Sequence, residues 1–269
     1  MVANEVVSVR ADESSRLDAA IDAALAEERV VGGVASVSRD GERIYERAFG
    51  LADREAGIPV VPDTIFRLAS VTKPIVSLAA LRLIEQDEMA LDDPVHAWLP
   101  DFRPAGPDGH PATILIRHLL THTSGLSYAV AEQGVSTGLA QPGLSMQENL
   151  ARLAALPLAF DPGTSWVYGL SIDVLGAVIQ KVTRESLETV VRTQVLAPLG
   201  LPEDAFSFAL APGTPNLAQP YVNDDPRPHR LVGEETVGAE RGRGGTTFDP
   251  SRIFDAASFP SGGAGAAST

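Results

Sequence analysis

Residues 66–84 read FRLASVTKPIVSLAALRLI, and this stretch decides how the rest of the chain is interpreted. Apolar side chains recur at helical spacing behind Ser70, so the pattern predicts a helix that begins there. Pro74 lies close enough to this start for its missing N–H to be tolerated. Because residues three apart share one face of a helix, we expect the hydroxyl of Ser70 and the amine of Lys73 within hydrogen-bonding reach.

A serine and a lysine paired in this way have a chemical use. A serine hydroxyl is a weak nucleophile until a base takes its proton, and a neutral lysine can be that base. Lysine is protonated in water at neutral pH, so the pair needs an apolar floor, which Phe66, Leu68 and Ile75 can supply. A nucleophile at a helix N-terminus also lies beside free N–H groups that can stabilise an oxyanion.

Lysine is scarce in this chain. Of the 21 basic residues only Lys73 and Lys181 are lysines, and the others are arginines. Arginine keeps its proton at any accessible pH, whereas a buried lysine can become a neutral amine. The scarcity therefore favours a titrating role for Lys73, while Lys181 is expected on a helix surface without such a role.

The bulk composition limits the partners. The 269 residues can bury a substantial core, and a net charge of −14 opposes binding to nucleic acid or to anionic membranes. There is no cysteine and the five histidines lack metal-ligand spacing, so no metal or other cofactor is expected. The first ten residues lack the features of a signal peptide and no segment resembles a membrane span, which predicts a soluble, cytoplasmic protein.

Periodicity and turn signals predict the elements on either side of Ser70. Before it, apolar spacing indicates a helix over 17–25, and Asp40 with Gly41 predicts the turn of a β-hairpin between 34–37 and 44–49. After it, helices are predicted over 150–156, 171–182 and 186–196. Residues 202–250 are rich in proline and glycine and are interpreted mostly as loop, and residues 261–265 are small and flexible in composition.

Further motifs follow FRLASVTK in a fixed order. They are LDDPV (91–95), LLTHTSGL (119–126), PGTSWVY (162–168) and DVLG (173–176). Together these blocks resemble the class C β-lactamase-like serine hydrolases, and most closely the carboxylesterases of the β-lactamase fold (family VIII esterases). The resemblance implies that Ser70 is the acylated nucleophile, that Lys73 is its partner, and that the phenol of Tyr168 shares the proton transfer. Without the resemblance, Tyr168 would be interpreted as a packed aromatic side chain.

The resemblance also implies a fold. We expect an α/β (α+β) protein of the β-lactamase or penicillin-recognising type, in which a helical domain lies beside an antiparallel sheet flanked by helices. Residues 1–66 would form the N-terminal part of the sheet domain, 67–250 a mainly helical domain with long loops, and 251–269 a return toward the sheet domain. The family continues beyond the position of Thr269, so the C-terminal part of the sheet is expected to be missing.

The C-terminal segment that the resemblance leads us to expect beyond Thr269 matters for the expected chemistry. In the family it carries the third motif and one backbone N–H of the oxyanion hole, and loss of such a donor typically costs about 3–4 kcal/mol of transition-state stabilisation. Arg243, Gly244 and Gly245 resemble a third motif only superficially, because they precede the family's small-residue block.

Two residues bear on the substrate: the one two positions after Tyr168, and Tyr128. Class C β-lactamases usually have asparagine two residues after the catalytic tyrosine, where this chain has Leu170. The change favours ester hydrolysis or acyl transfer over antibiotic hydrolysis. Leu170 is accordingly a candidate substrate-binding residue, and so is Tyr128, for which simple packing or exposure is an equal alternative.

Three functions therefore stay open. The first is a serine carboxylesterase that hydrolyses small or short-chain esters through an acyl-enzyme at Ser70. The second is a β-lactamase or D-amino-acid peptidase that uses the same residues. The third is an inactive or binding-only fragment, for which a missing C-terminal segment would be the natural partner. The sequence leaves the oligomeric state open.

A second serine competes for the role of nucleophile. Residues 134–138 read GVSTG and match G-x-S-x-G, the motif that places a nucleophilic serine between a strand and a helix. Here the flanking residues predict neither a hydrophobic strand before Ser136 nor a helix after it. We therefore expect Ser136 in a surface loop. His118 and His122, four apart with no third ligand, are expected to be structural.

Overall fold

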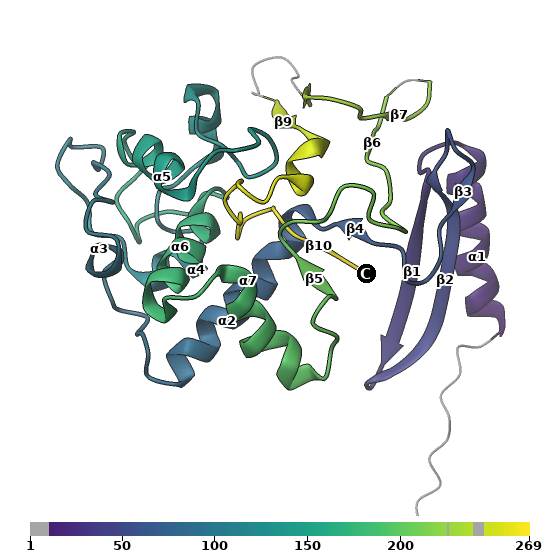
Figure 1. Cartoon of the computed structure of the whole chain (residues 1–269), viewed down its shortest axis with the longest axis horizontal. Helices are drawn as coiled ribbons and strands as arrows, with labels where there is room; N and C mark the ends of the chain where they lie inside the picture. The colour runs from purple at the N-terminus through teal and green to yellow at the C-terminus, as the bar shows by residue number, and fades with distance from the viewer. Residues whose placement is uncertain (1–10, 225, 239–244) are drawn as a thin grey trace, which may run out of the picture. The chain divides into compact units, whose positions relative to one another are not determined.

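The computed structural model describes residues 11–224, 226–238 and 245–269. Within these ranges the chain forms two compact units. One contains the described residues up to Phe66 together with 213–231 and Thr269, and the other contains 67–212 and 232–268. Figure 1 shows the elements of each unit. The three-part domain organisation expected from the sequence stays a prediction.

The first unit is built on a helix and a hairpin. Its elements are α1 (Ala11–Ala26), β1 (Gly32–Arg39), β2 (Glu42–Asp53), β3 (Ile58–Pro59), β6 (Tyr221–Val222) and β7 (His229–Arg230). Asp40 and Gly41 join β1 to β2 with φ angles of 52° and 84°, and two positive values are what the tightest hairpin turns require. The strands pair in the order β1-β2-β3, with α1 along the hairpin (Figure 1). The predicted first helix and hairpin are confirmed.

The second unit is mainly helical and is organised around α6. Its helices are α2 (Thr72–Glu85), α3 (Val95–Trp98), α4 (Ile116–Leu120), α5 (Met146–Ala154), α6 (Ser171–Thr183) and α7 (Leu187–Val191). All residues of α6 from Ser171 to Ile179 are buried, because α2, α4 and α7 pack around this helix (Figure 1). A helix that is mostly apolar on every face is a core helix. The helix predicted over 171–182 is confirmed.

Two other helices depart from their predicted ranges. α5 begins at Met146, earlier than expected, because the side chain of Ser145 accepts a hydrogen bond from the N–H of the third residue after it. The helix predicted over 186–196 is divided, since α7 ends at Val191 and a π-helical turn (Arg192–Leu196) follows it. Among the described helices, none combines the length and apolar composition that a membrane span requires.

Short strands lie in the region that the sequence indicated as mostly loop. They include β5 (Phe206–Ser207), β8 (Glu235–Val237) and β9 (Thr246–Phe248), and β5 belongs to a small sheet of order β4-β10-β5 with β4 (Phe66–Arg67) and β10 (Ala267–Ser268). Strands β8 and β9 pair as an antiparallel ladder. Runs of two or three residues are too short to show the alternation that predicts a strand. Arg243 and Gly244 lie outside the described residues, so the superficial third motif is not described.

The small-residue block 261–265 is buried, and the expectation of a flexible tail is wrong. A Cβ added at Gly262 would lie 2.6 Å from the carbonyl oxygen of Ile172 in α6, and one at Gly263 would overlap the carboxylate of Asp173. Ser261 has no exposed surface. Glycine occupies these positions because the backbone lies directly against α6 and leaves no room for a side chain. Close approach rather than mobility therefore explains the composition.

Candidate active site

Ser70 lies where a one-turn 3-10 helix (Ala69–Val71) leads into α2. The preceding residue, Ala69, has a φ of 43°, a left-handed conformation that costs a non-glycine residue about 1–2 kcal/mol. The N–H of Leu68 donates to the carbonyl of Ala266 (2.8 Å), which fixes the chain just before this turn. The prediction that Ser70 begins a helix is confirmed. The turn leaves Ser70 exposed at the helix start, where the positive end of the helix dipole favours negative charge.

Lys73 is buried beside Ser70, with 6% of its surface exposed. Its Nζ donates hydrogen bonds to Ser70 Oγ (3.0 Å), to the Tyr128 hydroxyl (3.1 Å) and to the carbonyl oxygen of Gly263 (2.7 Å). These three contacts match the three hydrogens of an ammonium group. The predicted pairing of Ser70 with Lys73 is therefore present in the structure.

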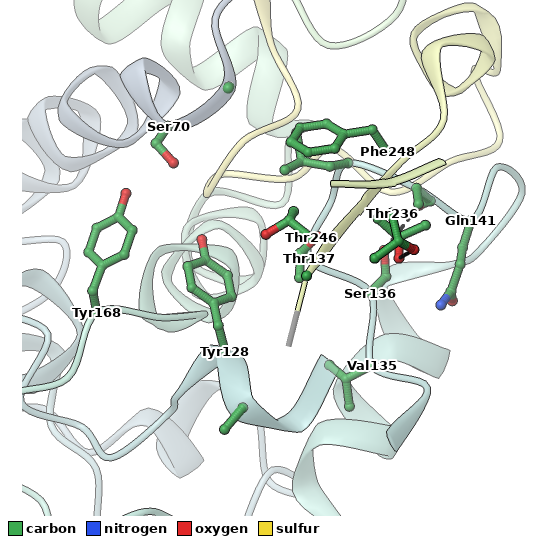
Figure 2. Close-up of a pocket in the computed structure, with 16 residues that line it drawn as sticks. Ser70, Tyr128, Val135, Ser136, Thr137, Gln141, Tyr168, Thr236, Thr246 and Phe248 are labelled. Carbon is green, nitrogen blue, oxygen red and sulfur yellow. Dashed lines mark hydrogen bonds between the residues drawn. The ribbon is translucent and has the colours of Figure 1, made fainter. Parts of the chain in front are cut away.

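Two tyrosines converge on the serine and the lysine. The rings of Tyr128 and Tyr168 meet edge to face with centroids 5.6 Å apart, and Nζ of Lys73 lies 4.6 Å from the centroid of Tyr168. Figure 2 shows the phenol oxygen of Tyr168 pointing toward Ser70, with Tyr128 beside it. The structure thus places Tyr168 with Ser70 and Lys73, as the resemblance implied.

A backbone contact holds the tyrosines together. Ser127 and Gly169, which adjoin them in sequence, form an antiparallel bridge, and the N–H of Leu170 donates to the carbonyl of Leu126 (3.0 Å). A Cβ at Gly169 would overlap that carbonyl. Only glycine therefore allows the two segments to approach closely enough to pair the rings.

The two phenols have opposite electrostatic environments. Burial raises the pKa of Tyr168, but hydrogen bonds with Lys73 and Ser70 and the charge of Lys73 outweigh it, so the pKa lies below the ordinary value. Burial raises the pKa of Tyr128, and the charges of Asp173 and Tyr168 raise it further, against a hydrogen bond with Ser70 that lowers it. Tyr168 is thus the phenol that gives up its proton more readily, and Tyr128 stays neutral.

A cavity of about 1000 Å³ opens beside Ser70 (Figure 2). Ser70, Tyr128 and Tyr168 lie on one side of it in Figure 2. Ala69 lies beside Ser70, and the other walls come from the segment after Tyr128 and from the β8–β9 ladder with the residue before it, namely Ala129, Val135, Ser136, Thr137, Leu139, Ala140, Gln141, Thr236, Gly245, Thr246, Thr247 and Phe248. These walls carry both hydroxyl groups and apolar side chains. The cavity can therefore hold a small organic molecule with both apolar and polar parts.

Leu170 does not line this cavity. Its side chain has no exposed surface and packs in the helical core, because the chain turns into α6 directly after Gly169. The expectation that Leu170 contacts substrate is therefore corrected: this side chain supports the helix that follows Tyr168. Tyr128, the other candidate substrate-binding residue, does line the cavity, and in addition its hydroxyl accepts a hydrogen bond from Lys73.

Ser136 of the G-x-S-x-G motif lies in a loop but not on the surface. Its exposed fraction is 2%, and its hydroxyl donates to the carbonyl of Ala140 (3.1 Å) and accepts from the N–H of Gly138 (3.2 Å). Asn149 accepts from the Ser136 N–H (2.8 Å). The loop prediction holds and the surface prediction is wrong, because these bonds fold the loop into the cavity wall. The Ser136 hydroxyl is committed to this structure.

His118 and His122 each make a structural contact within the second unit. Nδ1 of His118 accepts the N–H of Leu115 (3.2 Å) at the start of α4, and the ring of His122 packs against Tyr168 with centroids 4.8 Å apart. Burial, together with the charge of Lys73, lowers the pKa of His122. Within the described ranges, no group of three or more histidine, cysteine or acidic side chains could hold a metal ion.

Sequence reasoning missed two members of the site. The carbonyl of Gly263 accepts the shortest hydrogen bond from Lys73, and Asp173 binds the turn that carries Gly263. The signals were present: a glycine-rich block and an acidic residue within an apolar helix. Neither pattern reveals a contact between segments about 90 residues apart.

A serine just before α2 and a lysine three residues later match the S-x-x-K class of active sites, and Tyr168 joins them from the segment just before α6. The family model described as Beta-lactamase matches residues 17–269, and the chain belongs to this family. The resemblance and the fold predicted from the motif blocks are confirmed.

Two relatives indicate where the chain lies within the family. It is 48% identical over 261 residues to Esterase EstB of Burkholderia gladioli, an alignment that covers 94% of this chain and 66% of EstB. It is 33% identical over 226 residues to ML-236A carboxylate methylbutanoyltransferase mlcH of Penicillium citrinum, covering 76% of this chain and 54% of that protein. The chain thus spans between about half and two thirds of the length of these relatives.

A solved structure agrees closely with this fold. It is described as EstCE1, a hydrolase with promiscuous acyltransferase activity, and it superposes with a TM-score of 0.91 at 39% sequence identity. The match covers 97% of this chain and 70% of EstCE1.

Proposed function

We propose that this protein is a serine carboxylesterase that hydrolyses small or short-chain esters through an acyl-enzyme at Ser70. The observation that carries the proposal is the hydrogen bond of 3.0 Å between Lys73 Nζ and Ser70 Oγ, with Tyr168 beside the pair: Lys73 Nζ lies 4.6 Å from the centroid of the Tyr168 ring. The identity of 48% to an esterase supports ester chemistry over other acyl transfers of the family.

Acylation begins when the Ser70 oxygen attacks the carbonyl carbon of the ester. Its proton passes to the Tyr168–Lys73 pair, in which Tyr168 has a lowered pKa and Lys73 supplies the neighbouring positive charge. The negative charge that develops on the carbonyl oxygen lies at the start of α2, where the Ser70 N–H is available. When the tetrahedral intermediate collapses, the C–O bond breaks and the alcohol leaves with the proton held by the pair.

Deacylation repeats these steps with water. Water enters from the cavity beside Ser70, loses a proton to the Tyr168–Lys73 pair and attacks the acyl carbon. Collapse of the second intermediate breaks the bond to Ser70, whose oxygen recovers the proton, and releases the carboxylic acid. Tyr128 stays protonated throughout and holds Lys73 in place through the hydrogen bond of 3.1 Å.

The cavity also favours a second activity, acyl transfer to an alcohol. At about 1000 Å³ it is larger than a short acyl chain needs, so an acceptor alcohol can enter beside the acyl-enzyme and replace water. The similarity to a methylbutanoyltransferase and to a hydrolase with acyltransferase activity supports this proposal.

Pre-steady-state kinetics with p-nitrophenyl butyrate tests the esterase proposal. We expect a burst of p-nitrophenol with an amplitude close to the enzyme concentration, which Ser70→Ala abolishes. Ser77→Ala is the matched control, because Ser77 lies on the same helix and does not line the cavity. A burst that persists in Ser70→Ala would contradict the proposal, and a higher kcat/KM for nitrocefin or a D-alanyl amide than for the ester would favour the β-lactamase or peptidase alternative.

A further inference from the structure

Asp173 is a buried charge that the catalytic steps above leave unused. It lies in the first turn of α6, its exposed fraction is 2%, and it does not line the cavity. Burial of a carboxylate is unfavourable unless hydrogen bonds and opposite charges compensate for the lost water. The partners of Asp173 therefore indicate why an acidic residue occupies an otherwise apolar part of the helix.

Those partners belong to the turn that starts at Ser261. Oδ1 of Asp173 accepts hydrogen bonds from the hydroxyl of Ser261 (2.5 Å) and from the N–H of Gly263 (3.1 Å). The Ser261 hydroxyl in turn accepts the N–H of Ala264 (3.0 Å), and the Ser261 carbonyl accepts that of Gly265 (2.9 Å). One carboxylate oxygen thus fixes both ends of the segment Ser261–Gly263.

The same segment contacts the catalytic lysine from its other side. Gly263 donates its N–H to Asp173 and accepts Lys73 Nζ through its carbonyl at 2.7 Å, the shortest of the three hydrogen bonds of that lysine. A Cβ at Gly263 would overlap the Asp173 carboxylate, so the peptide lies directly against the first turn of α6. A continuous chain of contacts therefore runs from Asp173 through Gly263 and Lys73 to Ser70.

We propose that Asp173 is a positioning residue for Lys73: it holds the Gly263 carbonyl against the ammonium group and supplies the buried negative charge that balances the lysine. This inference rests on the esterase proposal for its kinetic consequences. Asp173 touches neither the cavity nor Ser70, so it acts only through Gly263 and through its charge.

The charged and titratable groups around Asp173 set the sign of the electrostatic effect. Burial raises the pKa of Asp173 above its ordinary value, and the bonds from Ser261 and Gly263 and the charges of Lys73 and Arg252 offset only part of that rise. The negative charge of Asp173 in turn raises the pKa of both Tyr128 and Tyr168, in the same direction as burial. For Tyr168 this charge opposes Lys73, which lowers the pKa. The groups facing this cluster are Lys73 from α2, His122 after α4, Tyr128, Tyr168 and Arg252.

Two substitutions separate position from charge. Asp173→Asn keeps an acceptor oxygen for Ser261 and Gly263 but removes the charge, so the ionisation of Tyr168 becomes easier. We expect the ascending limb of the kcat/KM–pH profile to move to lower pH, with KM little changed. Asp173→Ala also releases the turn, and a misplacement of about 1 Å in a catalytic group can lower kcat about 100-fold. The kcat values are expressed per active site, counted from the burst amplitude, so that unfolded protein does not contribute.

Asp53→Asn is the matched control. Asp53 is also a buried carboxylate, with 9% exposure, and it pairs with Arg230. Both of these residues belong to the unit that does not contain Asp173. We expect its pH profile to be that of the wild type. A wild-type pH profile in Asp173→Asn, together with a wild-type kcat per active site in Asp173→Ala, would overturn the inference.

A spectroscopic measurement keeps the inference testable even if the esterase proposal fails. Because Lys73 and Lys181 are the only lysines, ¹³Cε/¹⁵Nζ-labelled lysine gives two signals, which Lys181→Arg assigns. We expect both Asp173 variants to move the Lys73 signal and to leave that of Lys181 in place. An unmoved Lys73 signal in folded Asp173→Asn and Asp173→Ala refutes the positioning role. A moved Lys73 signal in a protein without a burst refutes the esterase proposal and supports the positioning role.

Discussion

Gly169→Ala tests whether one backbone contact sets the spacing of the two active-site tyrosines. The added Cβ would overlap the Leu126 carbonyl oxygen and would lie 2.9 Å from both the carbonyl carbon of Leu126 and the Cα of Ser127. These are backbone atoms, so no flexible side chain can move aside. Ordinary carbon–carbon contacts are about 3.5–4.0 Å, so the segments must separate by roughly 1 Å or more.

That separation affects both stability and catalysis. Overpacking of a buried site costs about 1–3 kcal/mol of unfolding free energy, and the hydrogen bond from Leu170 N–H to Leu126 (3.0 Å) weakens as well. A displacement of about 1 Å at Tyr168 lowers kcat about 100-fold. We therefore expect a lower urea midpoint, together with a loss of kcat that persists when the remaining protein is fully folded.

The matched control is Gly233→Ala, because no atom lies within 4 Å of a Cβ added at Gly233. Urea unfolding followed by circular dichroism, and kcat for p-nitrophenyl butyrate per burst-titrated site, measure the two effects. Gly169→Ala with the urea midpoint and kcat of Gly233→Ala would show that the close contact at Gly169 does not pair the tyrosines.

Three further predictions follow from the site. The pKa of Tyr168 lies below the ordinary value for tyrosine, so we expect kcat/KM to rise with pH at pH values below that ordinary pKa. Tyr168→Phe should remove this rise from the pH–rate profile. Lys73→Arg keeps the charge but cannot release a proton, so we expect kcat to fall about 10²- to 10⁴-fold in a protein whose thermal unfolding is close to that of Lys181→Arg; an unchanged kcat would exclude Lys73 from proton transfer. Leu170→Asn places an amide in the core rather than in the cavity, so unfolding free energy should drop by about 2–5 kcal/mol without a gain in nitrocefin hydrolysis, and a gain at wild-type stability would show that the side chain faces substrate.

Local signals predicted the elements that position Ser70. Asp40 and Gly41 specified the hairpin because few residue pairs adopt two positive φ angles, and the pattern over 171–182 specified a helix, which the structure then places in the core. The pairing of Ser70 with Lys73 followed from helical spacing alone, whereas Tyr168 entered only through the resemblance to a family. The structure places Tyr168 beside Ser70 and Lys73 because the antiparallel bridge between Ser127 and Gly169 joins its segment to that of Tyr128. No rule of sequence spacing predicts such a bridge.

The features that the sequence did not predict depend on how the chain packs around each residue, which local patterns do not give. The turn at 261–265 is composed of small residues. In the sequence alone such a run indicates flexibility, whereas in the structure it allows the backbone to pack closely against α6. Leu170 follows Tyr168 by two residues, yet the direction of its side chain depends on where α6 begins. Ser136 matches a nucleophile motif, but its hydroxyl is held by the carbonyl of Ala140.

Covalent labelling tests the central claim that Ser70 is the nucleophile. The protein is incubated with a serine-reactive fluorophosphonate, its intact mass is measured, and the labelled peptide is sequenced. We predict one adduct per chain, located on Ser70 and absent from Ser70→Ala. An adduct on Ser136 would contradict this account, and so would an unmodified Ser70 in folded protein.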